Sequence, residues 1–220
     1  MIKMSNISLK KYTILGERNS GTNYLEKIIN TNFHSKIVWD YGWKHFFGFS
    51  NYENSDDVVF IGIVRNFPDW ANSSLFRPYH LQRELRKNKK NFLTSEFWSY
   101  NDEFSSSKDG KEIMEDRNIY TNERYKDIFD CRENKLKFLI EDMPKKVKNF
   151  ILIRYEDLLY NFGDTVNMIR DKGNFTIKNP YFPVNITHLN KLNRKEITKE
   201  DIVKNINYRD TYEKVLYPFT

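Results

Sequence analysis

The sequence predicts an α/β fold in which helices flank a mostly parallel central sheet. Short apolar segments alternate along the chain with segments that carry apolar residues at helical spacing. One apolar segment, residues 58–64, is a continuous β-branched and apolar run, which is typical of a parallel strand buried on both faces. The length of 220 residues suits a single domain, in which residues 75–145 form an insert.

The predicted elements begin with a strand, a turn and a helix. The first strand is YTIL at 12–15, and GERNSGT at 16–22 is a glycine-punctuated turn. The helix that follows carries apolar side chains at helical spacing, namely Tyr24, Leu25, Ile28 and Ile29. A second strand is predicted at KIVWDY, residues 36–41.

The buried strand at 58–64 is followed by a helix that begins near Pro68, because proline is tolerated in the first turn. Beyond it, SSSKDG at 105–110 is a predicted loop. The pattern over 123–143 predicts one long helix that ends before Pro144.

The last third of the chain predicts one more strand and two helices. NFILIRY at 149–155 is the strand, and 162–170 is the helix after it. A loop is predicted at 179–185 and a terminal helix at 197–217, with Thr198 as its cap.

Composition limits the possible functions. The formal charge of +6 fits an anionic ligand as well as nucleic acid and does not decide between them, although no nucleic-acid motif is present. The single cysteine, Cys131, excludes an internal disulfide and a cysteine-based zinc site, and favours a reducing compartment. Because no signal-peptide pattern or long apolar run occurs, we expect a cytoplasmic protein without a membrane span. Glycosylation sequons at Asn72, Asn174 and Asn185 therefore carry little weight.

The turn at 16–22 begins like a loop that binds phosphate. Gly16 and Gly21 have the spacing of the two glycines in a P-loop, whose backbone N–H groups and following helix bind an anion. A nucleotide triphosphatase needs Lys and then Ser or Thr after the second glycine, but this chain has Thr22 and Asn23. Hydrogen bonds to a phosphate can come from Arg18, Ser20, Thr22 and Asn23. The alternative is an ordinary turn with a helix cap.

A second anion site is predicted after the buried strand. Arg65 follows the strand directly, and Ser73 lies two turns along the next helix. Together these side chains can hold a phosphate group. In the alternative, Arg65 pairs with Asp69 or another carboxylate, and Ser73 is a solvated helix residue.

These segments resemble the sulfotransferases that use 3′-phosphoadenosine 5′-phosphosulfate (PAPS). RNSGTNYLE at 18–26 is similar to the family's first motif, which binds the 5′-phosphosulfate. Arg65, Asn66, Asp69 and Ser73 match its second motif, and RYEDL at 154–158 looks like a later strand end. The resemblance implies the P-loop-like sulfotransferase fold and PAPS as the sulfuryl donor. It also implies that Arg65 and Ser73 bind the 3′-phosphate and that Tyr24 stacks on adenine.

The chain departs from the family pattern at two places. Many members have Lys or Arg just before Ser-Gly-Thr, where it contacts the bridging oxygen of the leaving group, but this chain has Asn19. Arg18 or Lys44 is the candidate to replace that cation. The proline of the second motif is displaced by one position, to Pro68, a shift that the start of a helix can absorb.

The candidate general base is His45, which follows the second predicted strand. Sulfuryl transfer is an in-line displacement that needs a base for the acceptor's proton and cations for the leaving group, and it needs no metal. His45 suits the first role and Lys44 the second. The alternative is a packed histidine beside a solvated lysine. Among the other histidines, His80 is a weaker candidate.

The acceptor is not identified by the sequence, and we expect its pocket in residues 75–145. That region is polar and basic, which slightly favours a glycan over a phenol. Four of its aromatic residues can stack on a ring or belong to the core, namely Phe92, Phe97, Trp98 and Tyr100. The basic run RELRKNKK at 83–90 would place its charges on one face if it were helical, although a solvated face is the simpler interpretation.

Two other functions stay open. One is a magnesium-dependent nucleotide or sugar kinase with a degenerate phosphate loop, which the missing lysine disfavours. The other is a non-catalytic module that binds a nucleotide or RNA, which the charge and the aromatic content permit.

Overall fold

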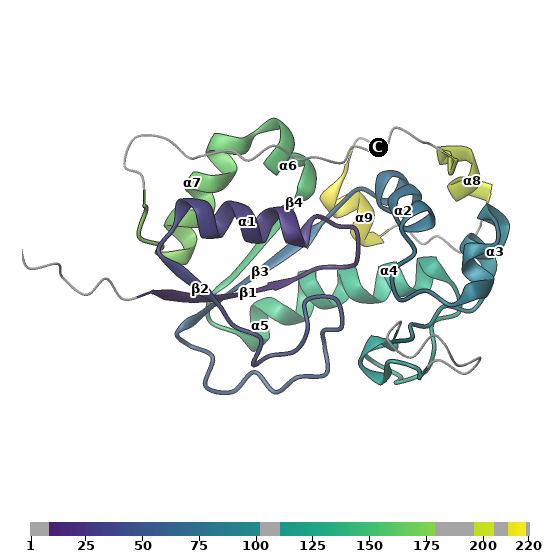
Figure 1. Cartoon of the computed structure of the whole chain (residues 1–220), viewed down its shortest axis with the longest axis horizontal. Helices are drawn as coiled ribbons and strands as arrows, with labels where there is room; N and C mark the ends of the chain where they lie inside the picture. The colour runs from purple at the N-terminus through teal and green to yellow at the C-terminus, as the bar shows by residue number, and fades with distance from the viewer. Residues whose placement is uncertain (1–8, 102–110, 179–195, 205–210, 219–220) are drawn as a thin grey trace, which may run out of the picture.

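The computed structural model describes residues 9–101, 111–178, 196–204 and 211–218 (Figure 1). Within them, four strands form one parallel sheet in the order β2-β1-β3-β4. The strands are β1 (Lys10–Leu15), β2 (Ser35–Ile37), β3 (Val58–Val64) and β4 (Phe150–Arg154). The predicted α/β class with a mostly parallel sheet is therefore confirmed, and the observed pairs are all parallel.

The order of the strands creates a switch point between β1 and β3. From β1 the chain moves outward to β2, and it then crosses to the other side of β1 to form β3 and β4. In open parallel sheets, ligands bind beyond the carboxyl ends of the two strands at such a point. The segments that begin at Gly16 and Arg65 follow these two ends.

Helices cover both faces of the sheet (Figure 1). On one face lie α1 (Thr22–Asn32), α6 (Tyr155–Tyr160) and α7 (Phe162–Gly173), and on the other lie α4 (Ile128–Lys137) and α5 (Met143–Lys146). Successive side chains of β3 point to opposite faces of the sheet. Ile61 packs on the face covered by α1 and α7, and Phe60 packs on the face covered by α4. All seven residues of β3 are buried, which confirms the expectation from its apolar run.

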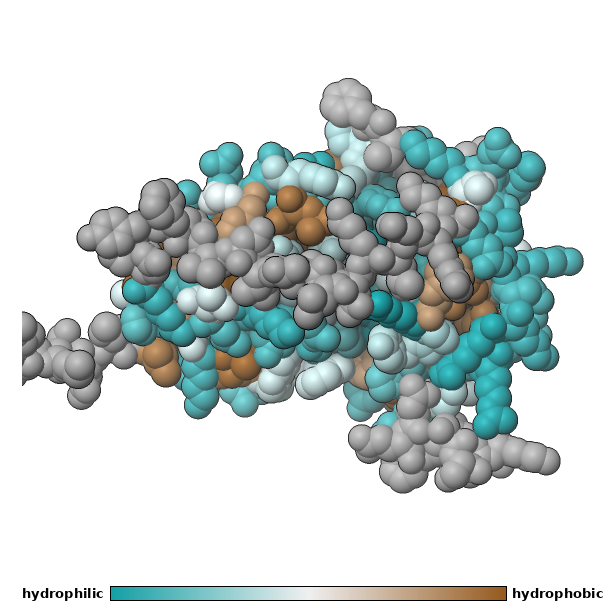
Figure 2. All heavy atoms as spheres, turned by 45° about the horizontal axis from the view of Figure 1, so that its top comes forward, coloured by the Kyte–Doolittle hydropathy of each residue, from teal (hydrophilic) through white to brown (hydrophobic). Residues whose placement is uncertain are grey.

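A third group of buried residues lies beyond the carboxyl edge of the sheet. It joins α2 (Phe67–Phe76), the 3-10 helix Arg83–Arg86, α3 (Lys89–Thr94) and α8 (Lys199–Lys204) to one end of α4. A further 3-10 turn spans Met114–Asp116. On the face shown in Figure 2, hydrophilic side chains predominate and hydrophobic ones form small separate patches. No helix in the described part of the chain has the length and apolar character that a membrane span requires.

The first half of the chain follows the predicted elements, with one shortened strand. The apolar residues of α1 are buried as expected, and α2 has its proline in the first turn. The second strand ends at Ile37 instead of 41. Among the described strands it pairs with β1 alone, and after Val38 the chain turns so that the rings of Trp39 and Trp43 pack against each other at an angle of 38°.

The predicted single helix over 123–143 is wrong at both ends. Helix α4 begins only at Ile128, because Asp127 caps it by accepting a hydrogen bond from the N–H of Asp130. A π-helical turn, Phe138–Asp142, then leads into α5. Pro144 lies in the first turn of α5, where its missing N–H is tolerated.

Within the predicted terminal helix over 197–217, the structure describes helix at α8 and at α9 (Thr211–Leu216), and residues 205–210 lie outside the described part. Thr198 does cap α8, since its Oγ1 accepts from the N–H of Asp201. The predicted loops at 105–110 and 179–185 lie outside the described residues. The basic run at 83–90 is not one helix, because the 3-10 helix Arg83–Arg86 ends before Asn88, which caps α3.

Candidate functional site

The glycine turn between β1 and α1 depends on its second glycine. Gly21 has φ of 103°, and a Cβ there would lie 2.4 Å from the ring of Tyr155. Asn19 also has positive φ, at 63°, a region that Asn tolerates better than most residues. The turn is closed by a hydrogen bond from Ser20 Oγ to the carbonyl oxygen of Glu17. Only glycine fits at position 21 without moving the tyrosine.

The turn leaves the N-terminus of α1 without a side-chain cap. Gly21 is the N-cap residue, and no acidic side chain lies in the first turn. The positive end of the helix dipole is therefore not neutralised by the helix's own residues. An uncapped helix end after a glycine turn is where a phosphate group binds in nucleotide sites.

Arg65 connects the two segments at the switch point. Its Nη1 donates to the carbonyl oxygen of Asn19 over 3.2 Å, and its guanidinium lies 4.8 Å from the ring centroid of Tyr155. Its Nε is buried and has no hydrogen-bond partner among the described residues. The alternative, in which Arg65 pairs with Asp69 or another carboxylate, is not seen among the described residues, and Asp69 accepts a hydrogen bond from Asn66. A buried guanidinium N–H without an acceptor is the feature that an anionic ligand would satisfy.

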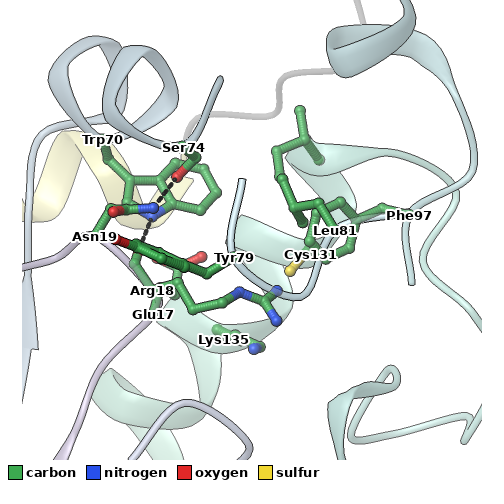
Figure 3. Close-up of a pocket in the computed structure, with 11 residues that line it drawn as sticks. Glu17, Arg18, Asn19, Trp70, Ser74, Tyr79, Leu81, Phe97, Cys131 and Lys135 are labelled. Atoms are coloured by element: carbon green, nitrogen blue, oxygen red, sulfur yellow. Dashed lines mark hydrogen bonds between the residues drawn. The ribbon is translucent and has the colours of Figure 1, made fainter. Parts of the chain in front are cut away.

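The side chain of Asn19 points toward helix α2 (Figure 3). Its Nδ2 lies 3.3 Å from Oγ of Ser74 and 3.1 Å from the carbonyl oxygen of Arg77. Ser73, on the same helix, is half-buried, and its hydroxyl makes no hydrogen bond among the described residues. The structure therefore places Asn19 against α2 and leaves the Ser73 hydroxyl available.

Arg18 does not extend toward the uncapped helix. Its guanidinium donates to Ser99 Oγ over 2.6 Å and lies 3.0 Å from a carboxylate oxygen of Asp116. The rings of Phe46 and Phe97 lie 5.5 and 5.7 Å from it. Although burial opposes ionisation, Lys135 and Arg18 hold the pKa of Asp116 well below its usual range. Arg18 is therefore part of a buried ionic cluster behind the turn.

Lys44 reaches the first turn of α1. Its Nζ donates to Oδ1 of Asn23 over 2.5 Å and lies 3.5 Å from a carboxylate oxygen of Glu26. The rings of Trp39 and Trp43 lie 5.7 and 5.2 Å from the ammonium group. Of the two cations proposed to replace the missing one at position 19, Lys44 is the one beside the uncapped end of the helix.

His45 is fixed by the glycine turn. Its Nδ1 lies 2.8 Å from the carbonyl oxygen of Gly16, which only accepts hydrogen bonds, so Nδ1 carries the proton. In the neutral ring, Nε2 then has the free lone pair. Burial, with the positive charges of Arg18 and Lys44 nearby, lowers the pKa of His45 to about 3. The imidazole is therefore neutral near pH 7 and has the tautomer of a proton acceptor.

Tyr24 is largely buried. Its ring packs edge-on against Tyr155, with the centroids 6.2 Å apart. Thr22 is also buried, in the first turn of α1. Thr22 and Asn23 lie at the end of α1, whereas Arg18 and Asn19 point elsewhere, and Tyr24 presents little open ring surface for stacking.

The sequence analysis missed a buried ionic network beneath the turn. Arg132, on α4, is 1% exposed and forms ion pairs with Glu17 and Glu213. Burial raises the pKa of Glu17, and Arg132 opposes this shift. The second oxygen of Glu17 has no hydrogen-bond partner among the described residues. Nothing in the local sequence around Arg132 distinguishes it from a surface arginine, so only the fold reveals this role.

A narrow pocket lies between the turn, α2 and α4 (Figure 3). It combines charged side chains with an apolar wall, and its lining residues include Glu17, Lys135, Trp70, Tyr79, Phe97 and Cys131. Among the described residues, no group of three His, Cys, Asp or Glu side chains is arranged to hold a metal ion.

Most of the aromatic residues suggested for the acceptor belong to the core. Phe92, Phe97 and Tyr100 are buried, and only Trp98 is partly exposed, where it lies under Arg124. The sequon residue Asn72 is also buried, and both ends of its amide are hydrogen-bonded. The exposed aromatic ring nearest in sequence to the candidate base is Trp43, at 47% exposure.

Comparisons with known proteins leave the family of this chain unassigned. No family model, no curated protein and no solved structure matches the sequence or the fold. The resemblance to the sulfotransferases remains a prediction from the motifs.

Proposed function

We propose that this protein transfers a sulfuryl group from PAPS to a hydroxyl or amine acceptor. One observation carries the proposal: two features suited to anion binding meet at the switch point. Neither includes the Lys and Ser or Thr pair that triphosphate hydrolysis requires after the second glycine. The uncapped α1 follows Gly21, and Arg65 reaches across to Asn19 with a buried N–H unpaired. A nucleotide with phosphate groups on both its 5′ and 3′ positions would engage both features.

In this proposal the first turn of α1 binds the 5′-phosphosulfate. Backbone N–H groups after Gly21, the hydroxyl of Thr22 and the amide of Asn23 are the donors, whereas the predicted donor Ser20 already gives its O–H to Glu17 and supports the turn. Arg65 and Ser73 bind the 3′-phosphate. We assign Arg18 to support of the turn, because its guanidinium is already paired with Asp116.

The reaction is an in-line displacement at sulfur. The acceptor oxygen or nitrogen forms a bond to sulfur while the bond from sulfur to the bridging oxygen breaks, and that oxygen leaves with the 5′-phosphate. The acceptor's proton moves to Nε2 of His45, whose other nitrogen is held by Gly16. Lys44 opposes the negative charge that develops on the bridging oxygen. The negative charge of the bound donor would raise the pKa of His45 toward the range in which a base is effective.

The kinase alternative is supported less well. Lys44 lies near the first turn of α1, where the phosphate-loop lysine of a kinase acts, so one observation favours it. However, the residue after β3 is Arg65, where a magnesium-binding carboxylate is found in P-loop enzymes. A cation at that point favours a second phosphate over a metal ion.

The acceptor side of the site lies near the segment that carries His45. Trp43, two residues earlier, is exposed, and its ring packs against that of Trp39 at an angle of 38° with the centroids 5.0 Å apart. A ring that is held in place but open to solvent suits an acceptor whose other face stays in water, such as a sugar. This position replaces the buried aromatic residues of 92–100 as the proposed acceptor surface.

Thermal unfolding without magnesium tests the donor assignment. A ligand that binds only the folded protein raises its melting temperature, so 3′-phosphoadenosine 5′-phosphate (PAP) should raise it more than AMP or ATP at equal concentration. Arg65→Ala should remove the difference between PAP and AMP. A larger effect of ATP, seen only with magnesium, would instead support the kinase.

A further inference from the structure

Three successive backbone groups after strand β3 are each held by a charged side chain. The carbonyl oxygen of Arg65 accepts a 2.6 Å hydrogen bond from Nη2 of Arg132. The N–H of Asn66 donates to Oε1 of Glu156 over 3.1 Å. The N–H of Phe67 donates to Oε1 of Glu213 over 2.8 Å. The backbone around Arg65 is therefore fixed by side chains from three different helices.

These side chains converge on the C-terminal segment that contains α9. Oε2 of Glu213 accepts from both Nη2 and Nε of Arg132, at 2.9 and 3.2 Å. The hydroxyl of Tyr217 donates to Oε2 of Glu156 over 2.9 Å. The two carboxylates that hold the N–H groups of Asn66 and Phe67 thus depend on residues 213–217.

The network is buried, so its charged groups must be paired with good hydrogen-bond geometry. Glu213 and Tyr217 are each 7% exposed, and the guanidinium of Arg132 lies 5.2 Å from the ring centroid of Trp70. Buried ion pairs stabilise a fold little more than apolar contacts of the same size would. Apolar contacts would also dock α9, but they would not fix the hydrogen-bonding groups on either side of Arg65.

We infer that Arg132, Glu213 and Tyr217 are positioning residues for the guanidinium of Arg65, so that the donor site is complete only when α9 is docked. The inference rests on the proposed function, in which Arg65 binds the 3′-phosphate. The hydrogen bond from Nη1 of Arg65 to the carbonyl oxygen of Asn19 is already long, at 3.2 Å. A small displacement of its backbone would break that contact and move the guanidinium away from the phosphate.

Two mild substitutions test the inference in the full chain. Glu213→Gln removes the charge and places an NH2 group against either the N–H of Phe67 or the guanidinium of Arg132. Tyr217→Phe removes the hydroxyl that donates to Glu156. Matched controls are Glu200→Gln on α8, which is exposed, and Tyr160→Phe on α6, which is 74% exposed. Arg132 is left unchanged, because its loss would leave buried carboxylates unpaired.

The first readout is the ratio of the dissociation constants for AMP and PAP, measured by calorimetry. In Glu213→Gln the affinity for PAP should fall by about tenfold, while the affinity for AMP, which lacks the 3′-phosphate, changes by less than about twofold. Tyr217→Phe should show the same pattern with a smaller effect, and the controls should match the wild type. Equal losses for PAP and AMP, or no loss of PAP affinity, would overturn the inference.

The second readout needs no nucleotide. Hydrogen exchange at the amides of Asn66 and Phe67 should become faster in Glu213→Gln and Tyr217→Phe, while exchange in β1 stays unchanged. Wild-type exchange at both amides in both variants would also overturn the inference. If the wild-type protein binds no PAP, the proposed function fails, and the exchange rates still decide whether α9 holds the Arg65 backbone.

Discussion

Nδ1 of His45 lies 2.8 Å from the carbonyl oxygen of Gly16, and this contact ties the candidate base to the turn that we propose as the donor site. The carbonyl group fixes both the orientation of the ring and its tautomer, so that Nε2 is the nitrogen that can accept a proton. Gly16 is itself constrained, since a Cβ there would lie 2.7 Å from the carbonyl oxygen of Ile63. The candidate base and the glycine turn are therefore held together as one unit.

Replacing His45 with Gln should lower sulfuryl transfer by about 100- to 1,000-fold and leave PAP binding within about twofold. The amide of Gln can still donate to Gly16, but it cannot take up the acceptor's proton. Single-turnover transfer from PAPS and calorimetry with PAP measure the two effects. Transfer at the wild-type rate would exclude His45 as the base.

The low pKa of His45 predicts how stability depends on pH. The unfolded chain takes up a proton on this residue near its ordinary pKa of about 6.5, whereas the folded protein resists protonation until about pH 3. The contribution of His45 to stability is therefore complete above pH 6.5 and is lost progressively as the pH falls toward 3. The free energy of unfolding of the wild type should fall, relative to His45→Gln, by about 1 kcal/mol per pH unit below 6.5. Denaturant unfolding between pH 7 and 5 measures this difference, and parallel curves for the two proteins would contradict it.

Lys44 and Arg18 should respond differently to removal of their charge. Lys44→Met should lower transfer by about 100-fold with little loss of stability, because the ammonium acts on the leaving group. Arg18→Met should lower the free energy of unfolding by about 3 kcal/mol, because Asp116 loses one of its buried partners. Transfer assays and denaturant unfolding of both variants test this assignment, with the exposed Lys36→Met as control. The opposite pattern would return the catalytic role to Arg18.

Gly21→Ala should abolish donor binding and lower stability by about 1–3 kcal/mol, because the positive φ and the contact with Tyr155 both oppose a Cβ. Gly163, in α7, is the matched control, since a Cβ there would meet no atom within 4 Å. Gly163→Ala should change the free energy of unfolding by less than about 0.5 kcal/mol, because Gly163 lies in the first turn of α7 and not in its interior. Unfolding curves and PAP titrations measure both variants. Normal PAP binding by Gly21→Ala would show that the turn does not hold the donor.

The fold was largely predictable because its strands are encoded locally. The apolar run of 58–64 and the spacing of Tyr24, Leu25, Ile28 and Ile29 report burial directly, and both predictions are confirmed. The long helix over 123–143 was overestimated because the cap at Asp127 and the π turn before Pro144 depend on local hydrogen bonds that apolar periodicity does not report.

The site was predictable only where the motif and the strand end coincide. Arg65 and the turn at 16–22 follow β3 and β1, so their proximity follows from the topology of the sheet. The partners of Arg18, and the network of Arg132 and Glu213, join residues that are far apart in the sequence. No local pattern marks such pairs, because each partner is an ordinary charged residue in its own stretch of the sequence.

The most direct test of the account is calorimetric titration of the protein with PAP, AMP and ATP in magnesium-free buffer, with a second ATP titration in the presence of magnesium. The account predicts that PAP binds most tightly, that removal of the 3′-phosphate weakens binding by about 100-fold, and that Arg65→Ala removes this preference. Equal affinity for PAP and AMP in the wild type, or tight binding of ATP that requires magnesium, would contradict the assignment of PAPS as the donor.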